Sequence, residues 1–307
     1  MYPLKLQSVL KDIIWGGTTL SEKYGKGHEG QKIAEAWVLS CREDGTNTIK
    51  NGELAGKDLS CLYSTSDFPL LIKLIDARDK LSVQVHPDDE YAKKEGLPAG
   101  KTEMWYILDA AENAELVYGL TKDCTVSDKD IKAAAESGDL EKYLCRKKVK
   151  KGDVLFIPAG LVHAIGGGIL IAEVQQNSNT TYRLYDYDRK DKNGNRRELH
   201  IQKALEVINR ALPSEDCNPT IIKETMDFTE KLLCKCNYFC VKSLELHGKR
   251  EMTADKMLFA LCTEGGGNFI YKNQSYSFSK GDGYLFPENT GIFSAVSDGC
   301  ELLLASE

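Results

Sequence analysis

The segment Gly152–His163, with the sequence GDVLFIPAGLVH, contains a turn, a short strand and a histidine in immediate succession. Its first two residues are common turn residues. The apolar run from Val154 to Ile157 predicts a strand, and Pro158 ends it. Because His163 follows a strand end, we expect its side chain to close a site from the rim of a sheet or barrel.

Short strands are predicted along most of the chain. They fall in segments that are β-branched, aromatic or alternating and often bounded by Gly, Pro or Asp: 68–75, 80–86, 102–108, 153–157, 169–175 and 181–185. One helix is predicted after an N-cap at Ser127, over 128–135, with an extension over 140–144 left open. A second is predicted over 198–211, where an apolar stripe contains Leu199, Ala204, Leu205 and Ile208. Many strands and few helices predict a mostly β fold of barrel or jelly-roll type.

The turn and strand of the opening segment are repeated later in the chain. Lys151-Gly152-Asp153 followed by Pro158 is echoed by Lys280-Gly281-Asp282 followed by Pro287, with Ile292 in place of His163. A Lys-Gly-Asp hairpin turn could recur by chance, but the shared proline offset favours two related barrels. We expect a catalytic barrel with helical segments in residues 1–212 and a second, degenerate barrel in 213–307, separated by the polar stretch 212–216.

Composition excludes several classes of protein. The 307 residues carry a formal net charge of −6, and non-specific nucleic-acid binding needs a basic surface. The N-terminus has no apolar signal-peptide core, and no run approaches a membrane span in length. Ten scattered cysteines then predict reduced thiols and a cytoplasmic location. Their densest group, Cys234, Cys236 and Cys240, lacks a second Cys or His pair, which favours packed thiols over a zinc site.

Four side chains are candidate metal ligands: Gln84, His86, Glu103 and His163. Residues two apart on a strand point to the same face, so Ser82 shares a face with Gln84 and His86, and Lys101 shares one with Glu103. Two imidazoles, one carboxylate and one amide oxygen suit one divalent metal per chain. Zn²⁺ is favoured, and Mn²⁺ or Fe²⁺ stays open.

A single strand histidine is more often structural than a ligand. The chain has five histidines, however, and two of them fall in these motifs, which favours the metal site. His28, His200 and His247 have no comparable context, and we expect them to be surface or packing residues. Gln84 is the weakest of the four candidates, because an amide is a poor metal ligand. The alternative is that Gln84 orients a metal-bound water without binding the metal itself.

The motifs resemble those of a known superfamily. Gly152, Pro158, Gly160 and His163 resemble the second motif of the cupins, and Gln84-Val85-His86 resembles their paired ligands with Gln in place of the first His. The gap from His86 to Glu103 is longer than the usual cupin spacing.

A sharper resemblance combines QVHPD at 84–88, KTEMW at 101–105 and TYRLYDYDR at 181–189. Together with WGG at 15–17 and EAW at 35–37, these segments are similar to the short bacterial form of the type I mannose-6-phosphate isomerase family. The similarity runs from about Trp15 to Arg189 and continues weakly beyond. It implies a catalytic cupin barrel followed by a degenerate cupin barrel.

The resemblance implies reversible conversion of mannose 6-phosphate to fructose 6-phosphate by proton transfer through an enediolate, which a metal stabilises. Lys101 is expected to contact the substrate or to transfer a proton, the alternative being a solvated lysine. Arg183 matches the family's active-site arginine, and its planar fork suits the phosphate or an enediolate oxygen. Its alternative is an ion pair with Asp186 or Glu173.

The phosphate and the proton also need binding groups. Ser82 is a candidate for the phosphate, and Lys73 is a weaker one. The general base stays open among Lys101, a metal-bound water and unassigned carboxylates.

Two other functions stay open from the sequence. His86, Glu103 and His163 alone would form the triad of a non-haem iron oxygenase, which iron content and O₂ uptake would reveal. A non-catalytic cupin would bind the phosphosugar without turning it over. The sequence predicts a phosphosugar as partner, no nucleic acid and no membrane, and it leaves the oligomeric state open.

Overall fold

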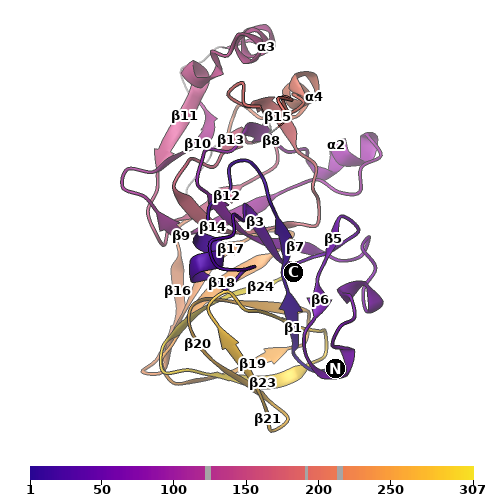
Figure 1. Cartoon of the computed structure of the whole chain (residues 1–307), viewed down its shortest axis with the longest axis vertical. Helices are drawn as coiled ribbons and strands as arrows, with labels where there is room; N and C mark the ends of the chain where they lie inside the picture. Colours follow the sequence, from indigo (N-terminus) through magenta and orange to yellow (C-terminus); the bar gives the residue numbers. More distant parts are fainter. Residues whose placement is uncertain (122–125, 191–192, 213–216) are drawn as a thin grey trace.

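The computed structural model describes residues 1–121, 126–190, 193–212 and 217–307. The molecule is elongated, with helices α3 (Asp128–Ser137) and α4 (Ile201–Val207) near one end and the C-terminal strands at the other (Figure 1). Strands dominate, so the predicted mostly β fold is confirmed. Among the helices of the described ranges, none has the length and apolar character needed to span a membrane.

Two antiparallel sheets form the half of the molecule that contains the sequence motifs. The first has the order β12 (Val154–Ile157), β9 (Glu103–Ala110), β14 (Ile169–Gln176), β7 (Leu70–Ala77), β3 (Glu35–Leu39) and β2 (Val9–Lys11). The second has the order β11 (Leu144–Lys148), β10 (Glu115–Leu120), β13 (His163–Ala164), β8 (Val83–Val85) and β15 (Tyr182–Tyr185).

An apolar interior lies between these two sheets. Trp105 and Ile171 enter it from the first sheet, and Leu116 and Tyr118 enter it from the second. The opposite face of the first sheet is also covered, because it packs on the C-terminal strands. Strands β7 and β14 are therefore buried along their whole length, which explains their nearly continuous apolar sequences.

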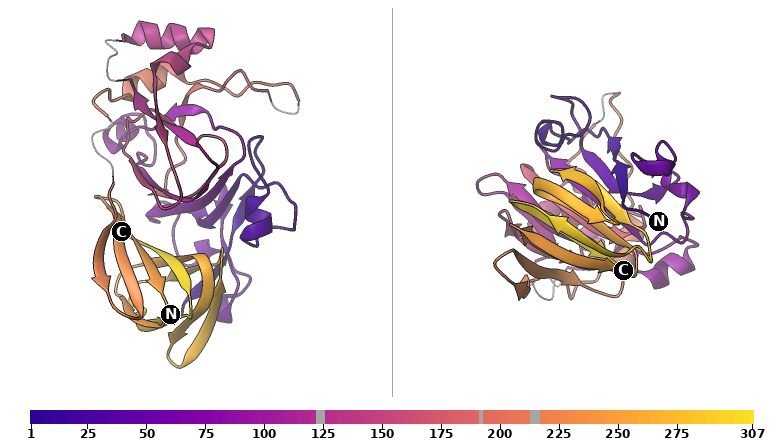
Figure 2. Two further views of the ribbon diagram at one scale, coloured as in Figure 1. Left: turned by 90° about the vertical axis from the view of Figure 1, so that its left-hand side faces the viewer. Right: turned by 90° about the horizontal axis from the view of Figure 1, so that it is seen from below.

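The C-terminal half is an eleven-stranded sheet that curls around its own core (Figure 2). Its main path runs β16 (Thr220–Glu224), β17 (Phe228–Lys235), β18 (Cys240–Leu246), β24 (Cys300–Ser306), β20 (Leu258–Tyr271), β22 (Gly283–Phe286), β1 (Leu4–Gln7) and β6 (Thr48–Ile49). Strands β19 (Lys249–Ala254), β21 (Gln274–Ser279) and β23 (Gly291–Val296) pair off this path. Its apolar core includes Phe269, Phe286 and Phe293, whose rings pack together.

The repeated Lys-Gly-Asp turns have the same geometry in both halves. Gly152 and Gly281 both have φ of +90°, a conformation that favours glycine. Gly152 N donates to Ile107 O and Ile107 N to Asp153 O, at 2.9 Å each. In the second turn, Gly281 N donates to Cys262 O at 2.8 Å and Cys262 N donates to Asp282 O at 2.9 Å. The two turns therefore bind to β9 and β20 in the same way.

The two halves share strands as well as a core. The N-terminal strand β1 pairs with β22, Leu4 opposite Leu285, and Lys5 Nζ lies 2.7 Å from an Asp282 carboxylate oxygen. The predicted division into 1–212 and 213–307 stays a prediction, and its boundary at 213–216 lies outside the described residues.

The helix predictions were correct in position and less accurate in length. Helix α3 begins after Ser127, whose side chain accepts from Asp130 N in a capping box. The open extension is the 3₁₀ turn η3 (Leu140–Tyr143). The predicted helix 198–211 is shorter in the structure and spans only α4. Before it, His200 N donates to Arg183 O on β15, and after it, Asn209 N donates to Gly160 O. Leu199 therefore lies outside the helix and is 37 % exposed.

Each predicted strand is present, although 80–86 shortens to β8. The remaining elements are short: α1 (Thr19–Lys23), α2 (Asp89–Lys94), η1 (Gly52–Leu54), η2 (Leu59–Cys61), β4 (Cys41–Arg42) and β5 (Gly45–Thr46).

Candidate metal centre and substrate pocket

Three of the four predicted ligands meet between the two sheets. His86, Glu103 and His163 each offer one ligand atom, and these atoms lie within 4.8 Å of one another. The carboxylate oxygens of Glu103 lie 3.6 Å from His86 Nε2 and 3.6 Å from His163 Nε2. Since metal–nitrogen and metal–oxygen bonds are about 2.0–2.2 Å long, one ion fits between these atoms after small side-chain adjustments.

Strand pairing brings these residues together from distant parts of the sequence. His163 on β13 lies opposite Gln84 on β8, and His86 follows β8 directly. Glu103 begins β9, opposite Ile157 of β12 and Gln175 of β14. The ligands therefore come from both sheets, and the metal centre would link them.

Backbone carbonyls fix the orientation of both imidazoles. Nδ1 of His86 lies 2.9 Å from Thr180 O, and Nδ1 of His163 lies 2.8 Å from Leu161 O. Because a carbonyl only accepts, each Nδ1 carries the proton and each Nε2 presents a lone pair toward Glu103. His86 Nε2 is buried, and within the described part of the chain it has no hydrogen-bond partner. This arrangement fits a cation.

Burial also sets the protonation states of the ligands. It lowers the pKa of His163 to about 4, against a smaller rise from the Leu161 carbonyl. Burial, then the charge of Lys101, lowers the pKa of His86 well below its ordinary value. Burial and the charge of Glu173 raise the pKa of Glu103 to about 7, while Lys101 opposes the rise. Both histidines are thus neutral at neutral pH, as metal coordination requires.

Gln84 and Lys101 lie beside this group. The amide nitrogen of Gln84 is 3.3 Å from His163 Nε2, so the amide reaches the edge of the centre. Lys101 Nζ lies 3.1 Å from Glu103 Oε2, and its side chain is 4 % exposed. Lys101 is therefore not a solvated lysine at the start of a strand.

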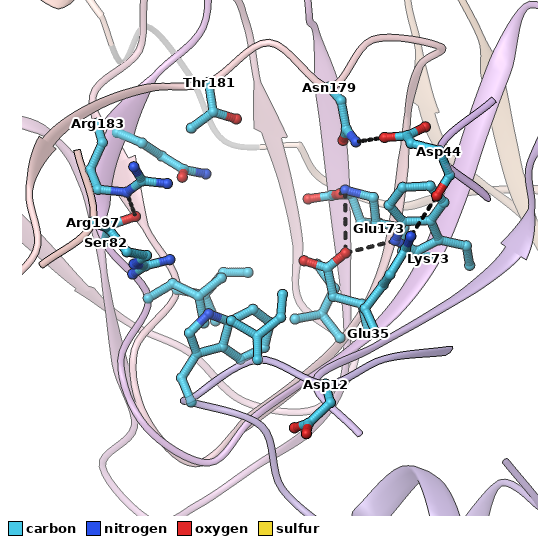
Figure 3. A pocket seen from close by; sticks show the side chains of 18 of the residues that line it. Asp12, Glu35, Asp44, Lys73, Ser82, Glu173, Asn179, Thr181, Arg183 and Arg197 are labelled. Carbon is cyan, nitrogen blue, oxygen red and sulfur yellow. Dashed lines mark hydrogen bonds and ion pairs between the residues drawn. The ribbon is translucent and has the colours of Figure 1, made fainter. Parts of the chain in front are cut away.

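A pocket of about 590 Å³ opens next to the metal centre. Gln84 and Lys101 form part of its lining. Figure 3 shows Ser82, Arg183 and Arg197 on one side, and Glu35, Lys73 and Glu173 on the other. The pocket thus has one wall with two guanidinium groups and a facing wall with a buried charge network.

Arg183 is held without a carboxylate partner. Its Nε donates to Ser82 Oγ at 3.3 Å and its NH1 donates to Glu198 O at 2.7 Å. Among the described residues, no carboxylate lies within ion-pair distance of it, so the alternative pairing with Asp186 or Glu173 is wrong. Asp186 instead binds Arg189 and Arg197, whose Nε donates to it at 2.8 Å. The positive charge of Arg183 is therefore available to an anion.

The sequence did not predict that Glu35, Lys73 and Glu173 form one charge network on the facing wall of the pocket. Lys73 and Glu173 are cross-strand neighbours on β7 and β14, with Nζ and Oε1 3.1 Å apart, and Glu35 Oε2 lies 3.9 Å from the same Nζ. Burial lowers the pKa of Lys73, but Glu173 and Glu35 outweigh it and the net shift is upward. Burial raises the pKa of Glu173, but the positive charges of Lys73 and Lys101 outweigh burial, and the net shift of this pKa is downward. The charged residues Lys73 and Glu173 inside the largely apolar strands LLIKLIDA and ILIAEVQQ were the available signal.

Replacing Lys73 by methionine is expected to destabilise the protein strongly. The substitution leaves Glu173 buried beside Glu103 without its main counter-charge, which costs about 3–5 kcal/mol. The midpoint of urea unfolding measures the loss. The double variant Lys73→Met/Glu173→Gln should recover part of it, and an unchanged midpoint in the single variant would contradict the pairing.

Two family models match separate parts of the chain. A family model described as the catalytic domain of type I phosphomannose isomerase matches residues 3–128. A model of the mannose-6-phosphate isomerase cupin domain matches residues 229–304. The cupin-type fold expected for both halves is thereby confirmed.

Full-length relatives match along nearly the whole chain. Mannose-6-phosphate isomerase ManA of Bacillus subtilis (strain 168) is 41 % identical over 304 residues, which cover 95 % of each protein. A mannose-6-phosphate isomerase of Streptococcus mutans is 36 % identical over 99 % of this chain and 98 % of its own. The crystal structure of a mannose 6-phosphate isomerase from Bacillus subtilis matches over 100 % of both chains, with 35 % identity and a TM-score of 0.92.

Proposed function

The chain belongs to the type I phosphomannose isomerase family, and on that premise we propose that it interconverts mannose 6-phosphate and fructose 6-phosphate beside His86, Glu103 and His163. The observation that carries this assignment is the buried gap between two oriented imidazoles and a carboxylate. Family membership sets aside the oxygenase and the non-catalytic binding protein.

His86, Glu103 and His163 would hold one divalent metal, with Gln84 at the edge of the centre. We propose Zn²⁺, because two neutral imidazoles and one carboxylate are a common zinc ligand set with an open position. When bound, the ion would supply a Lewis acid to the oxygens on the two carbons that exchange a proton.

The wall of the pocket with Ser82 and Arg183 suits the phosphate. Arg183 offers a fixed charge and a planar set of donors, and its Nε already donates to Ser82 Oγ. Arg197 lines the same wall, although Asp186 neutralises part of its charge. Holding the phosphate here would place the sugar carbons over the centre of the pocket, near Gln84 and Lys101.

We propose that side chains lining the pocket beside the metal ligands transfer the proton. Lys101 is buried against Glu103, and we propose that it contacts the reacting end of the substrate or moves its proton. Glu173 is a second candidate, because its carboxylate lines the pocket. The catalytic machinery then lies within residues 1–212.

We further propose that the protein works in the cytoplasm, without a nucleic-acid partner, in keeping with its acidic net charge and its reduced thiols.

Removing the metal is expected to abolish turnover reversibly. After dialysis against a chelator, formation of fructose 6-phosphate, followed in a coupled assay, should fall by about two to three orders of magnitude, because the metal supplies several kcal/mol of charge stabilisation. Adding back Zn²⁺, Mn²⁺ or Fe²⁺ separately identifies the ion that restores the rate.

Elemental analysis of the same samples provides the control for this experiment. Full turnover by protein that contains no metal would exclude the proposed role of the centre. Binding of mannose 6-phosphate without any product, in metal-loaded protein, would exclude the isomerase itself.

A further inference from the structure

Four cysteines lie close together in the C-terminal half, away from the proposed active site. Cys217 precedes the edge strand β16, Cys234 lies on β17, Cys236 follows β17, and Cys240 begins β18. The sequence singled out the last three as a group without assigning them a role. The structure adds Cys217, which the pairing of β16 with β17 brings beside this group.

Two of these sulfurs are close enough to react with each other. Cys217 Sγ and Cys234 Sγ are 4.0 Å apart, about twice the length of a disulfide bond. The register places Thr220 opposite Leu232, so the chain before β16 runs past the end of β17, where Cys234 lies. Rotation of the half-buried Cys217 side chain could then close the remaining distance.

A metal is a poorer match for the same sulfurs. Four thiolates around Zn²⁺ would all lie within about 4 Å of one another, given Zn–S bonds of about 2.3 Å. Among the described residues, however, no third Cys, His or carboxylate ligand atom joins this pair within 4.8 Å. Cys236 Sγ instead accepts a hydrogen bond from Tyr238 N at 3.4 Å.

We propose that Cys217 and Cys234 form a site of reversible oxidation, where a hydroperoxide converts the two thiols into a disulfide. Cys217 reacts first, because it is the less buried of the two. Its sulfur attacks one oxygen of hydrogen peroxide and becomes a sulfenic acid, while the O–O bond breaks and the other oxygen leaves as water. The Cys234 sulfur then displaces the sulfenic oxygen as a second water. Two thiols and one peroxide thus give one disulfide and two waters.

Burial and the hydrogen bond to Cys217 support this order of events. The hydrogen bond from Cys217, followed by burial, raises the pKa of the Cys234 thiol, so Cys234 is a poor first nucleophile. Once Cys217 is oxidised, Cys234 is the sulfur already in contact with it.

The disulfide would restrain an otherwise weakly held strand. All five residues of β16 are exposed, β16 is the edge of its sheet, and its pairing with β17 contains a register shift. Linking Cys217 to Cys234 would tie the segment before β16 to β17, the strand with which β16 pairs. We expect slower hydrogen exchange of the β16 amides in the oxidised protein.

Peptide mapping of the full chain tests the proposal directly. The purified protein is treated with hydrogen peroxide, alkylated, and digested with trypsin without reduction. Trypsin yields 211–223 with Cys217, 232–235 with Cys234, and 236–242 with Cys236 and Cys240, so Lys235 separates the candidates. We expect 211–223 joined to 232–235, a loss of two of the ten thiols from that pair, and recovery of both with a reductant.

Variants decide between the outcomes. Cys217→Ser and Cys234→Ser should each prevent the cross-link, while Cys61→Ser, which removes an exposed thiol elsewhere, should leave it intact. Joining of 211–223 to 236–242, or oxidation of Cys217 that stops at the sulfinic acid with Cys234 still reduced, would overturn the proposal. None of these cysteines lines the active-site pocket, so the test is independent of the isomerase reaction.

Discussion

The variant His86→Ala is expected to lose both its bound metal and about 10³-fold in the rate of fructose 6-phosphate formation. His86 supplies one of two oriented imidazoles, and its Nε2 is buried and has no hydrogen-bond partner in the described part of the chain. Alanine leaves Glu103 with one histidine, which is too few ligands to hold a divalent ion tightly. Loss of Lewis-acid stabilisation worth several kcal/mol corresponds to about this change in rate.

Metal content and turnover must be measured on the same preparation of His86→Ala. The matched control is His28→Ala, since His28 is exposed and is not one of the ligand group. It should keep both metal and activity. A His86→Ala protein that retained a full equivalent of metal and normal turnover would falsify the metal centre as described.

The variant Arg183→Ala is expected to lower kcat/KM for mannose 6-phosphate by about 10²- to 10³-fold. Removing one partner of a desolvated charge pair costs about 2–5 kcal/mol, and each 1.36 kcal/mol is tenfold. Arg183 has no carboxylate partner among the described residues, so its charge is available to a dianionic phosphate. Metal content should be unchanged, because Arg183 is not in the ligand group.

Two controls separate phosphate binding from a structural role for Arg183. Arg183→Lys keeps the charge and should recover part of the loss, but the planar fork is gone. Arg196→Ala removes an exposed arginine that pairs with Asp188, and it should have little effect on turnover. If Arg183→Ala weakened the binding of unphosphorylated mannose as much as that of mannose 6-phosphate, the arginine would not be reading the phosphate.

Strand alternation was enough to predict most of the metal group. Gln84 and Glu103 lie on separate strands, β8 and β9, and the Gly152–His163 segment ends where expected, at the site. This worked because period-two geometry is local, so a face can be assigned without knowing which strands pair. The cupin-type fold was also predictable, because the repeated Lys-Gly-Asp turn indicated two related barrels. In the structure both turns take the same conformation.

Features that depend on pairing between distant strands were beyond the sequence. Lys73 and Glu173 look like isolated charges in apolar runs until β7 and β14 are placed side by side. The lack of a carboxylate partner for Arg183 among the described residues could not be predicted for the same reason. Arg189 and Arg197 bind Asp186, so Asp186 does not pair with Arg183. The end of α4 was misjudged because Asn209 turns to pair with Gly160, a contact between segments far apart in the chain.

The pairing of β1 with β22 has a consequence for how the chain is made. Leu4 is synthesised long before Leu285, which lies opposite it in the sheet. Along the edge that faces β22, β1 must therefore stay unpaired until β22 has been synthesised, although β6 can pair with its other edge earlier. Contacts of such long sequence separation slow folding. A fragment that ends near residue 212 would lack β22, one of the two strands that pair with β1, so we expect the catalytic half to complete its folding only after the C-terminal strands have been synthesised.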